Sequence, residues 1–367
     1  MNDRQYMAQA IRLAGQGIYS THPNPSVGCV IVAQGAVVGC GWHRRAGEPH
    51  AEILALDEAG GKARNAEVFL TLEPCSHHGR TPPCAGALVD AGVRRVVVAM
   101  QDPNPLVAGR GLERLRAAGI EVETGLLKDQ ARAMNPGFVS RMQRGRPWVR
   151  LKLASSLDGR TAMASGESQW ITGDAARRDV QRWRARSSAI VTGIGTVLAD
   201  DPSMNVRLEA QQLKGVEPVR QPLRVVMDTR LTMPEQAKML LLPGDTLLVT
   251  AVQDRSRWQA LQQAGAEVVA IPVGQGQLEP EAVLNLLADR EINEVLLECG
   301  ARLAGAFLSA ELVDELVLYI APHLMGDSAR GLFHLPGLQR MRDRIALEWL
   351  DVRQVGDVLR ITARPCY

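Results

Sequence analysis

A His-Ala-Glu triplet followed by two Pro-Cys pairs constrains this chain more than any other feature. One imidazole and two thiolates can hold a zinc ion tetrahedrally and leave the fourth position for water. We therefore predict that the fold brings His50, Cys75 and Cys84 together as zinc ligands, although they lie well apart in the sequence. The carboxylate of Glu52 is then placed to move the protons of that water as a general acid and base, without binding the metal itself.

The His-x-Glu and Pro-Cys signature is typical of zinc deaminases, in which water replaces an amino group on a ring carbon. The spacing departs from the usual form, because eight residues separate Cys75 from Cys84 where the usual pattern has two. A loop of this length beside the metal can carry substrate-binding groups, and Arg80 is the candidate phosphate donor. The alternative is a closed structural zinc site with His77 or His78 as fourth ligand, which would leave no position for water.

The length and charge of the chain narrow the class of protein. Its 367 residues correspond to about two domains, each able to bury its own core. The 42 basic and 40 acidic residues give a formal charge of +2, and aromatic residues make up only 4%. We therefore expect no binding to nucleic acid or to a membrane surface, since both need concentrated positive charge and single strands also stack on aromatic rings.

No apolar run approaches the roughly 20 residues needed to span a bilayer, and residues 1–17 lack a signal-peptide core. We expect a cytoplasmic protein. Its six cysteines are then metal ligands or small core residues rather than disulfides.

Residues 28–40 predict two apolar strands joined by a two-residue hairpin turn at Gln34-Gly35. That register would place Cys29 opposite Cys40, as buried small side chains rather than a redox pair. Strands and helices alternate beyond the hairpin: helix 50–60, strand 67–72, helix 84–91, strand 95–100, helix 111–118 and strand 121–125. This alternation predicts a layered α/β domain with a largely parallel sheet, in which the zinc ligands fall at or near helix N-termini.

Residues 143–147 have no apolar periodicity and end in a helix-stopping proline. We place a domain boundary there, with a first domain over 1–144, a linker near 145–147 and a second domain over 148–367. The second part again alternates strands, for example 189–192, 223–228 and 294–298, with helices such as 174–186 and 302–309, and it ends in a predicted hairpin over 346–363.

Two glycine turns follow apolar strands in the second part, at 192–196 and 299–305. Glycine lets backbone amides approach a pyrophosphate closely, and a dinucleotide could lie across both turns. The alternative is a pair of ordinary β-to-α turns. Arg184, Arg186 and Arg207 are candidates for a substrate phosphate, and spacing does not choose among them. Arg230 is a candidate for a cofactor 2′-phosphate, with a plain surface position as the alternative.

Several motifs together resemble the bifunctional deaminase and reductase family of riboflavin biosynthesis. The deaminase half is marked by Asn24-Pro-Ser-Val-Gly28, His50-Ala-Glu52 and Pro74-Cys-Ser-His-His-Gly-Arg-Thr-Pro-Pro-Cys84, whose long cysteine spacing is that family's own form. The reductase half is marked by Lys152-Leu-Ala-Ser-Ser-Leu-Asp-Gly159, Gln169-Trp-Ile-Thr172, Gly193-Ile-Gly-Thr196, Asp200-Asp-Pro202, Asn205-Val-Arg207 and Glu298-Cys-Gly300. The resemblance spans nearly the whole chain in the expected order.

The resemblance implies a cytidine-deaminase-like three-layer α/β/α domain followed by a dihydrofolate-reductase-like α/β domain. It implies zinc-dependent removal of the 2-amino group of a diamino-ribosylamino-pyrimidinone phosphate as ammonia, then NADPH-dependent reduction of the ribosyl group of the resulting uracil to ribityl. The partners implied are small phosphorylated pyrimidines and a second copy of the chain, through the second domain.

The resemblance also implies roles for individual residues. The deaminase substrate would be bound by Asn24, His43 and Arg80. The cofactor would be lined by Ala154, Trp170, Thr196, Asp200, Gly300, Ala301, Arg302, Leu303, Ala304 and Gly305. The reductase substrate would be held by Lys152, Ser168, Arg184, Asn205, Arg207 and Glu298.

Two other functions remain open at this stage. One is a deaminase of transfer-RNA adenosine or free nucleobases with an appended nucleotide-binding domain, for which the zinc motif alone is equally good evidence. The long cysteine loop and the second domain argue against it. The other is a zinc-stabilised nucleotide-binding regulator without turnover, in which Glu52 has no catalytic role.

Overall fold

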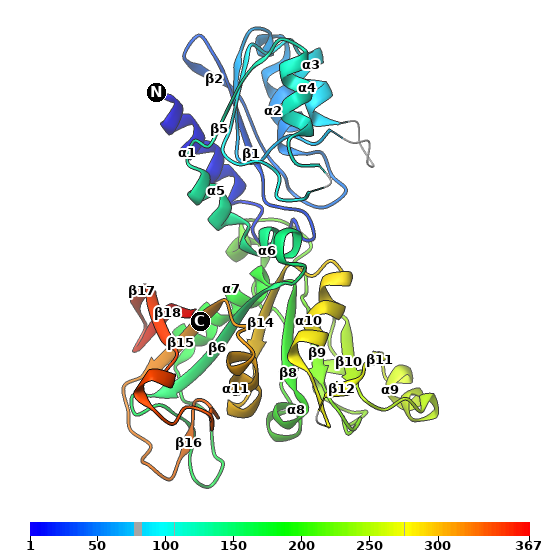
Figure 1. The fold of residues 1–367 in the computed structure, drawn as a ribbon, viewed down its shortest axis with the longest axis vertical. Coiled ribbons are helices and arrows are strands. Elements are labelled where there is room, and N and C mark those ends of the chain that lie inside the picture. Colours follow the sequence, from blue (N-terminus) through cyan, green and yellow to red (C-terminus); the bar gives the residue numbers. More distant parts are fainter. Residues whose placement is uncertain (77–82, 106, 275) are drawn as a thin grey trace. The chain divides into compact units, whose positions relative to one another are not determined.

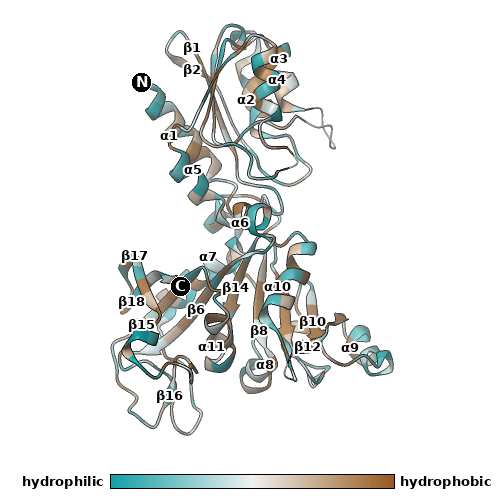
Figure 2. Cartoon of the chain, in the orientation of Figure 1, coloured by the Kyte–Doolittle hydropathy of each residue, from teal (hydrophilic) through white to brown (hydrophobic). Residues whose placement is uncertain are grey.

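The computed structural model describes residues 1–76, 83–105, 107–274 and 276–367 (Figure 1). The chain divides into two compact units, one comprising residues 1–146 with 210–218 and the other residues 147–209 with 219–367. Each unit is built around its own sheet, and the hydrophobic residues are concentrated along the strands (Figure 2).

The first unit has a five-stranded sheet. Its strands run in the order β2 (Ala36–Trp42), β1 (Gly28–Ala33), β3 (Glu67–Leu70), β4 (Arg95–Val98) and β5 (Glu121–Thr124). The strand β1 is antiparallel to both β2 and β3, whereas β3, β4 and β5 are parallel. A largely parallel sheet beyond the first hairpin is therefore confirmed.

Helices cover both faces of this sheet (Figure 1). On one face lie α1 (Asp3–Ala14), α5 (Lys128–Met134) and α6 (Pro136–Arg144), and on the other lie α2 (Ala51–Ala59), α3 (Cys84–Asp90) and α4 (Arg110–Ala117). Alternate strand residues make the two cores: Val30 and Phe69 face α1, whereas Ile31 and Val68 face α2. This is the predicted three-layer α/β/α arrangement.

The hairpin turn forms at Gln34-Gly35, but the predicted pairing of Cys29 with Cys40 is wrong. The register shifts between Ile31 and Val32, so that Cys29 pairs with Gly41, and Cys40 pairs with Val30. An extra residue in β2 therefore slips the pairing by one position, and a slip of one residue turns a side chain to the other face of a sheet. Cys29 is buried against the α2 side and Cys40 packs on the α1 side, and both are free thiols.

Gly41 sets how closely α2 approaches the sheet. A Cβ on Gly41 would lie 2.0 Å from the carbonyl oxygen of Ala51, at the start of α2. Only glycine permits this approach of helix backbone to strand backbone. Since His50 is the N-cap of α2, this packing fixes the position of the histidine that opens the zinc motif.

The second unit has a nine-stranded sheet. Its strands run in the order β11 (Ala266–Ala270), β10 (Thr246–Thr250), β9 (Leu223–Met227), β8 (Ala189–Gly193), β14 (Glu294–Glu298), β6 (Trp148–Ser156), β15 (Glu315–Ala321), β18 (Val358–Cys366) and β17 (Ala346–Val355). Neighbouring strands from β11 to β15 are parallel, and β18 and β17 form the predicted terminal hairpin.

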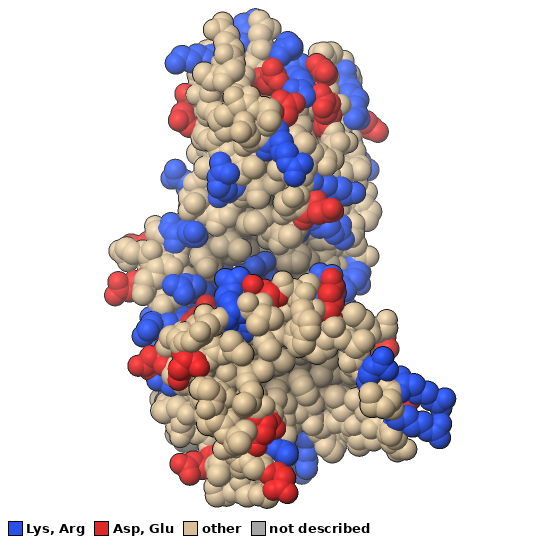
Figure 3. Space-filling model, turned by 90° about the vertical axis from the view of Figure 1, so that its left-hand side faces the viewer, with Lys and Arg blue, Asp and Glu red and all other residues tan. Residues whose placement is uncertain are grey.

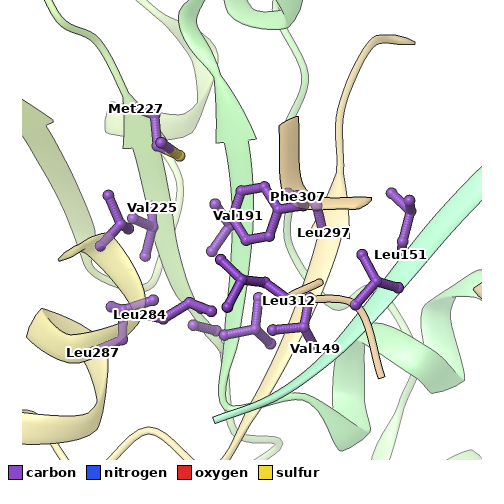
Figure 4. Close-up of a cluster of buried hydrophobic side chains, with 14 of the residues drawn as sticks. Val149, Leu151, Val191, Val225, Met227, Leu284, Leu287, Leu297, Phe307 and Leu312 are labelled. Carbon is purple, nitrogen blue, oxygen red and sulfur yellow. The ribbon is translucent and has the colours of Figure 1, made fainter. Parts of the chain in front are cut away.

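Helices also cover both faces of the second sheet. One face carries α10 (Pro280–Asp289) and α11 (Ala301–Ser309), and the other carries α7 (Asp174–Arg186), α8 (Ile194–Asp200) and α9 (Gln259–Gln263). Figure 4 shows the core between the sheet and the helices α10 and α11, where Phe307 of α11 packs among Val191, Leu297 and Leu151 of the strands. Two small sheets pair β12 (Val273–Gly274) with β13 (Gln277–Leu278) and β7 (Arg160–Ala162) with β16 (Arg330–Gly331). Short 3-10 helices span Gly60–Ala63, Ala210–Leu213, Lys238–Leu240, Arg255–Trp258 and Met341–Asp343.

The strand order of the second sheet reverses at its centre. The chain passes from β6 to β8, moves outward to β11 and returns with β14 between β8 and β6. In open α/β sheets, ligands bind outside the carboxyl ends of the strands at such a reversal. The carboxyl ends of β8, β14 and β6 are therefore the expected ligand-binding edge.

Candidate active sites

The three predicted zinc ligands come from three separate segments of the first unit. His50 is the N-cap of α2, Cys84 is the first residue of α3, and Cys75 lies in the loop after β3. Their ligand atoms all lie within 4.8 Å of one another. Among the residues that the structure describes, this is the one cluster of His, Cys, Asp and Glu side chains grouped closely enough to hold a metal.

The separations within the cluster fit a zinc ion. Nδ1 of His50 is 3.2 Å from Sγ of Cys84 and 3.7 Å from Sγ of Cys75. Bond lengths of about 2.0 Å to nitrogen and 2.3 Å to sulfur, at tetrahedral angles, require a nitrogen-to-sulfur separation of roughly 3.5 Å. The two observed values bracket this figure, so the donor set matches zinc in both chemistry and size.

The surroundings of Cys75 favour its thiolate form. The pKa of Cys75 is lowered to about 4, first by the thiol of Cys84 and then by hydrogen bonds from His50 and from the Cys84 backbone. The backbone N–H of Cys84 donates to Sγ of Cys75 over 3.3 Å. Because Cys84 is the first residue of α3, this N–H belongs to the group of helix N-terminal donors that have no partner within the helix. The pKa of Cys84 itself is raised, first by its hydrogen bond with Cys75 and then by burial, so the expectation that helix N-termini favour thiolate stays a prediction.

Glu52 lies in the first turn of α2 and is only 3% exposed. Burial raises its pKa to about 6, and its carboxyl group interacts with the thiol of Cys84. Glu52 therefore lies beside the ligand cluster without belonging to it. A carboxyl group whose pKa is close to neutral can both accept and donate a proton under physiological conditions.

Asn24 and His43 meet next to the zinc ligands. Nδ2 of Asn24 is 3.1 Å from Nε2 of His43, and Nδ1 of His43 is 3.2 Å from the carbonyl oxygen of Pro49. The ring of His43 is buried and lies edge-on to the ring of His50, with centroids 5.1 Å apart. Burial lowers the pKa of His43, which favours the neutral imidazole.

One residue that the sequence reasoning missed is Glu73, which precedes Pro74-Cys75. Its carboxylate is buried and accepts backbone N–H bonds from Asp102, Gly109 and Gly111 over 3.1, 3.0 and 2.9 Å. A Cβ on Gly111 would lie 2.1 Å from the carbonyl oxygen of Pro74. These contacts clamp the Cys75 loop to residues 102–111. The sequence offered one indication of this role, because Glu73 is an acidic residue at the end of an apolar strand, directly before Pro74 and the candidate ligand Cys75.

Part of the long cysteine loop lies outside the described residues. This applies to Arg80, the candidate phosphate donor, and to His77 and His78, the candidate fourth ligands.

In the second unit, the structure brings together most of the polar residues predicted for the reductase substrate. Nε and Nη2 of Arg184 on α7 donate to the two carboxylate oxygens of Glu298 at the end of β14, over 2.6 and 2.9 Å. Lys152 on β6 lies opposite Glu298 in the register of the neighbouring strands β6 and β14. Burial lowers the pKa of Lys152, and the charge of Glu298 opposes that shift. These residues lie near the carboxyl edge at the centre of the sheet.

Asn205 and Arg207 join the same cluster from the loop after α8. The backbone oxygen of Asn205 accepts from Nη1 of Arg184 over 3.3 Å, and its side-chain oxygen accepts from Nη1 of Arg207 over 3.2 Å. Arg186 lies elsewhere, since its Nε donates to Glu294 at the start of β14. The structure thus separates Arg186 from Arg184 and Arg207, which sequence spacing alone did not.

The two glycine turns lie side by side. Gly193 ends β8, and a Cβ there would lie 3.3 Å from Cδ2 of Leu303 on α11. Gly195 and Gly300 have open space where a side chain would be, and Gly300 is the N-cap of α11. These features suit a dinucleotide whose phosphates approach the backbone closely.

Gly305 has a packing role, because a Cβ there would lie 2.0 Å from the carbonyl oxygen of His334. Of the other candidate cofactor residues, Ala301 to Ala304 form the first turn of α11. Thr196 and Asp200 lie on α8, and Ala154 lies on β6.

Ser168 and Trp170 lie between β7 and α7. The Trp170 side chain is 71% exposed, and the guanidinium carbon of Arg177 lies 4.6 Å from its ring centroid. Trp170 is therefore a surface ring and not part of the core.

Together, the folds and clusters define a class of protein in which a zinc-dependent deaminase unit is joined to a nucleotide-dependent reductase unit. The model of the cytidine and deoxycytidylate deaminase zinc-binding region matches residues 1–100, and that of the RibD C-terminal domain matches residues 147–360. The chain belongs to the RibD family of riboflavin biosynthesis proteins, bifunctional enzymes that combine a deaminase and a reductase and use zinc and NADPH.

Relatives match over nearly the full length of the chain. Riboflavin biosynthesis protein RibD of Escherichia coli K12 is 50% identical over 361 residues, which are 97% of each chain. A solved structure of Acinetobacter baumannii RibD is 48% identical and superimposes with a TM-score of 0.92 over 100% of this chain and 99% of that one.

A third relative is the diaminohydroxyphosphoribosylaminopyrimidine deaminase/5-amino-6-(5-phosphoribosylamino)uracil reductase of Thermotoga maritima. Its structure is 31% identical, with a TM-score of 0.85 over 99% of this chain and 98% of that one.

Among the described residues, no helix is both long and apolar enough to cross a bilayer. Basic and acidic side chains are interspersed on the face drawn in Figure 3.

Proposed function

We propose that residues 1–144 remove the 2-amino group of 2,5-diamino-6-ribosylamino-4(3H)-pyrimidinone 5′-phosphate as ammonia. Residues 148–367 then reduce the ribosyl group of the product to ribityl, and residues near 145–147 link the two domains. The observation that carries this proposal is the convergence of His50, Cys75 and Cys84 within 4.8 Å beside the buried carboxylate of Glu52.

In the deaminase, His50, Cys75 and Cys84 hold zinc, which when bound lowers the pKa of a water molecule from about 15.7 toward 7. Glu52 would take one proton from that water and pass it to the ring nitrogen as the oxygen adds to the ring carbon. It would then take the second proton from the added hydroxyl group and pass it to the amino group, which leaves as ammonia. Its pKa of about 6 suits both transfers near neutral pH.

Asn24, His43 and Arg80 bind the deaminase substrate. The contact between Asn24 and His43 supports a shared surface next to His50, and the neutral imidazole of His43 can exchange one hydrogen bond with a pyrimidine edge. Arg80 binds the phosphate in this proposal, on the basis of the family motif.

In the reductase, NADPH, when bound, would supply the hydride that reduces the ribosyl group to ribityl. The cofactor is lined by Ala154, Trp170, Thr196, Asp200, Gly300, Ala301, Arg302, Leu303, Ala304 and Gly305. The substrate is held by Lys152, Ser168, Arg184, Asn205, Arg207 and Glu298. The three cations of this set outnumber its single carboxylate, which suits a substrate that carries a phosphate.

The direct test is to measure ammonia release and NADPH absorbance with the pyrimidine phosphate, together with the metal content of the purified protein. We expect ammonia release without NADPH, and NADPH oxidation only once deaminated product is present. Adenosine-bearing RNA should release no ammonia. Activity on RNA alone would reverse the choice between this function and a nucleic-acid deaminase.

We also propose that the enzyme is a cytoplasmic homodimer that associates through its second domain. The edge strand β17 and its neighbour β18 expose Leu347, Trp349, Val352 and Leu359, with exposed fractions of 38 to 62%. A long apolar edge strand of this kind favours pairing with another chain. We expect light scattering to give twice the chain mass and Trp349→Asp to shift it toward the monomer, whereas the exposed control Leu241→Asp leaves it unchanged.

A further inference from the structure

The strand that follows the first glycine turn ends in a charged segment, Asp228-Thr229-Arg230. The chain runs from β8 through the Gly193 turn and α8 to β9, which lies beside β8 and parallel to it. In dinucleotide-binding units of this order, the end of the second strand faces the 2′ position of the adenosine ribose. An acid there accepts from the 2′-hydroxyl of NAD, and an arginine there accommodates the 2′-phosphate of NADP.

Asp228 occupies the position of the NAD-type acid, but its carboxylate is already engaged. The side chain is buried and accepts the backbone N–H groups of Thr232 and Met233 over 2.6 and 2.8 Å, as well as the hydroxyl of Thr232 over 3.2 Å. These hydrogen bonds direct the carboxylate of Asp228 toward Thr232 and Met233 of the loop that follows. A ribose hydroxyl would have to compete with donors that the loop already supplies.

Arg230 is exposed at the same strand end, and a second arginine is fixed next to it. Nη2 of Arg257, from the loop after β10, donates to the carbonyl oxygen of Arg230 over 3.1 Å. The two loops are also joined by a bond from the N–H of Ala251 to the carbonyl oxygen of Thr229, over 3.1 Å. The guanidinium of Arg257 and the backbone of Arg230 are therefore held together by these contacts, and the Arg230 side chain is exposed beside them.

In the described part of the chain, Asp254 interacts with this pair of arginines: hydrogen bonds from Ser256 and, to a smaller extent, the charge of Arg257 lower its pKa. Neither Arg230 nor Arg257 takes part in a salt bridge there. The carboxylate of Asp254, three residues before Arg257, accepts from the N–H and hydroxyl of Ser256 over 3.0 and 2.7 Å. Arg230 thus has no acidic partner at salt-bridge distance among the described residues, whereas Arg257 shares its charge with Asp254 and can assist.

The strand register places the end of β9, which leads to Arg230, next to the first glycine turn. Gly193 pairs with Met227, and Arg230 follows three residues later in the chain. Neighbouring strands are about 4.8 Å apart, and an arginine side chain extends further than that spacing. A dinucleotide whose pyrophosphate lies at the glycine turns can therefore direct its adenosine ribose toward the ends of β9 and β10.

We propose that Arg230, assisted by Arg257, binds the 2′-phosphate of the cofactor and makes this reductase prefer NADPH to NADH. The inference rests on the proposed function, in which the second domain uses a nicotinamide dinucleotide. It assigns the choice between the two cofactors to residues outside the set named above.

The test is to titrate the full-length protein with 2′,5′-ADP and with 5′-ADP by calorimetry. We expect Arg230→Gln to weaken 2′,5′-ADP binding about ten-fold or more, since one charge-assisted contact is lost, and to leave 5′-ADP binding unchanged. Arg257→Gln should have a smaller effect in the same direction. The ratio of kcat/KM for NADPH to that for NADH should fall with the affinity for 2′,5′-ADP.

The matched control is Arg290→Gln, which also removes one positive charge. Arg290 pairs with Glu267 at the start of β11, on the amino edge of the sheet rather than the carboxyl edge. It should change neither titration. Unchanged 2′,5′-ADP binding in the Arg230 and Arg257 double variant, or an equal loss for both nucleotides, would overturn the 2′-phosphate assignment. A wild-type protein that binds neither nucleotide would instead remove the proposed reductase function, and the present inference with it.

Discussion

Arg184 and Glu298 form a bidentate ion pair, with Nε and Nη2 of the arginine 2.6 and 2.9 Å from the two carboxylate oxygens. The side chains are 12% and 14% exposed, so the pair is largely shielded from water. Burial alone would raise the pKa of Glu298, but Arg184, Lys152 and Arg207 hold it at about 2. The carboxylate is thus the negative centre around which the cations of the proposed reductase site are arranged.

Removing the negative charge of Glu298 should destabilise the second unit and lower its activity, and should leave the first unit unaffected. We expect Glu298→Gln to lower the free energy of unfolding by about 3 kcal/mol, because removal of one partner from a buried pair leaves the other charge uncompensated. NADPH oxidation should fall, and ammonia release should persist. Denaturant unfolding and the two activity assays check this. The control is Glu267→Gln, which breaks the more exposed pair with Arg290 and should cost less than about 1 kcal/mol.

Acid should weaken a second buried pair at the other end of the same strand. Burial alone would raise the pKa of Glu294, but Arg150 and Arg186 lower it to about 2, against an ordinary value of about 4.3. A depressed folded-state pKa gives stability that is fully present above the unfolded-state value and is lost as pH falls toward 2.

We therefore expect the unfolding free energies of wild type and Glu294→Gln to differ by roughly 2 kcal/mol less at pH 3 than at pH 7. Denaturant titrations at the two pH values measure this difference. An equal difference in unfolding free energy at the two pH values would show that the ionised form of Glu294 does not stabilise the folded state.

Much of the fold could be predicted from local patterns in the sequence. An apolar run bounded by turn residues predicts strand 294–298 with the bounds that the structure has, and helix 174–186 is predicted with its observed bounds as well. The helices α1, α5 and α6 were not predicted. The helices α5 and α6 are short, and contact with a sheet face formed by residues distant in the sequence holds them in place. The signals for α1 were present but not used: its buried residues Tyr6, Met7, Ala10 and Ala14 recur at helical spacing, and Asn2 and Gln5 form a capping box.

The zinc ligands could be predicted because their chemistry fixes both residue type and order. Glu73 could not, since its function depends on backbone N–H groups of residues 102–111, which no side-chain pattern records. The pairing of Cys29 was missed for a related reason, because the bulge that shifts it depends on how β2 packs rather than on the turn. The split between Arg184 and Arg186 likewise required the partners Glu298 and Glu294 to be located in space.

Glu52 should be essential for deamination and irrelevant to metal binding. We expect Glu52→Gln to reduce the rate of ammonia release by about 10²–10⁴-fold, because the amide cannot accept and return the proton. Zinc content and NADPH oxidation with the deaminated intermediate should match wild type. Retained deamination would contradict the general-base role, and loss of zinc would show that the carboxylate binds the metal.

Glu73 should control zinc affinity without touching zinc. Its carboxylate accepts N–H groups only, so Glu73→Gln would turn an amide N–H₂ toward donors and loosen the loop that carries Cys75. Groups that orient metal ligands typically change affinity by 10–100-fold when removed, and we expect a loss in that range by chelator competition.

Gly111→Ala offers an independent route to the same result, since its Cβ would press on the carbonyl oxygen of Pro74. Glu67→Gln serves as the control, because Glu67 lies at the start of the same strand β3 and pairs with Arg94 and Arg95 instead. Zinc affinity should be unchanged in that variant. If Glu73→Gln and Gly111→Ala both bound zinc as the wild type does while remaining folded, the Cys75 loop would have to be held by contacts other than the Glu73 clamp.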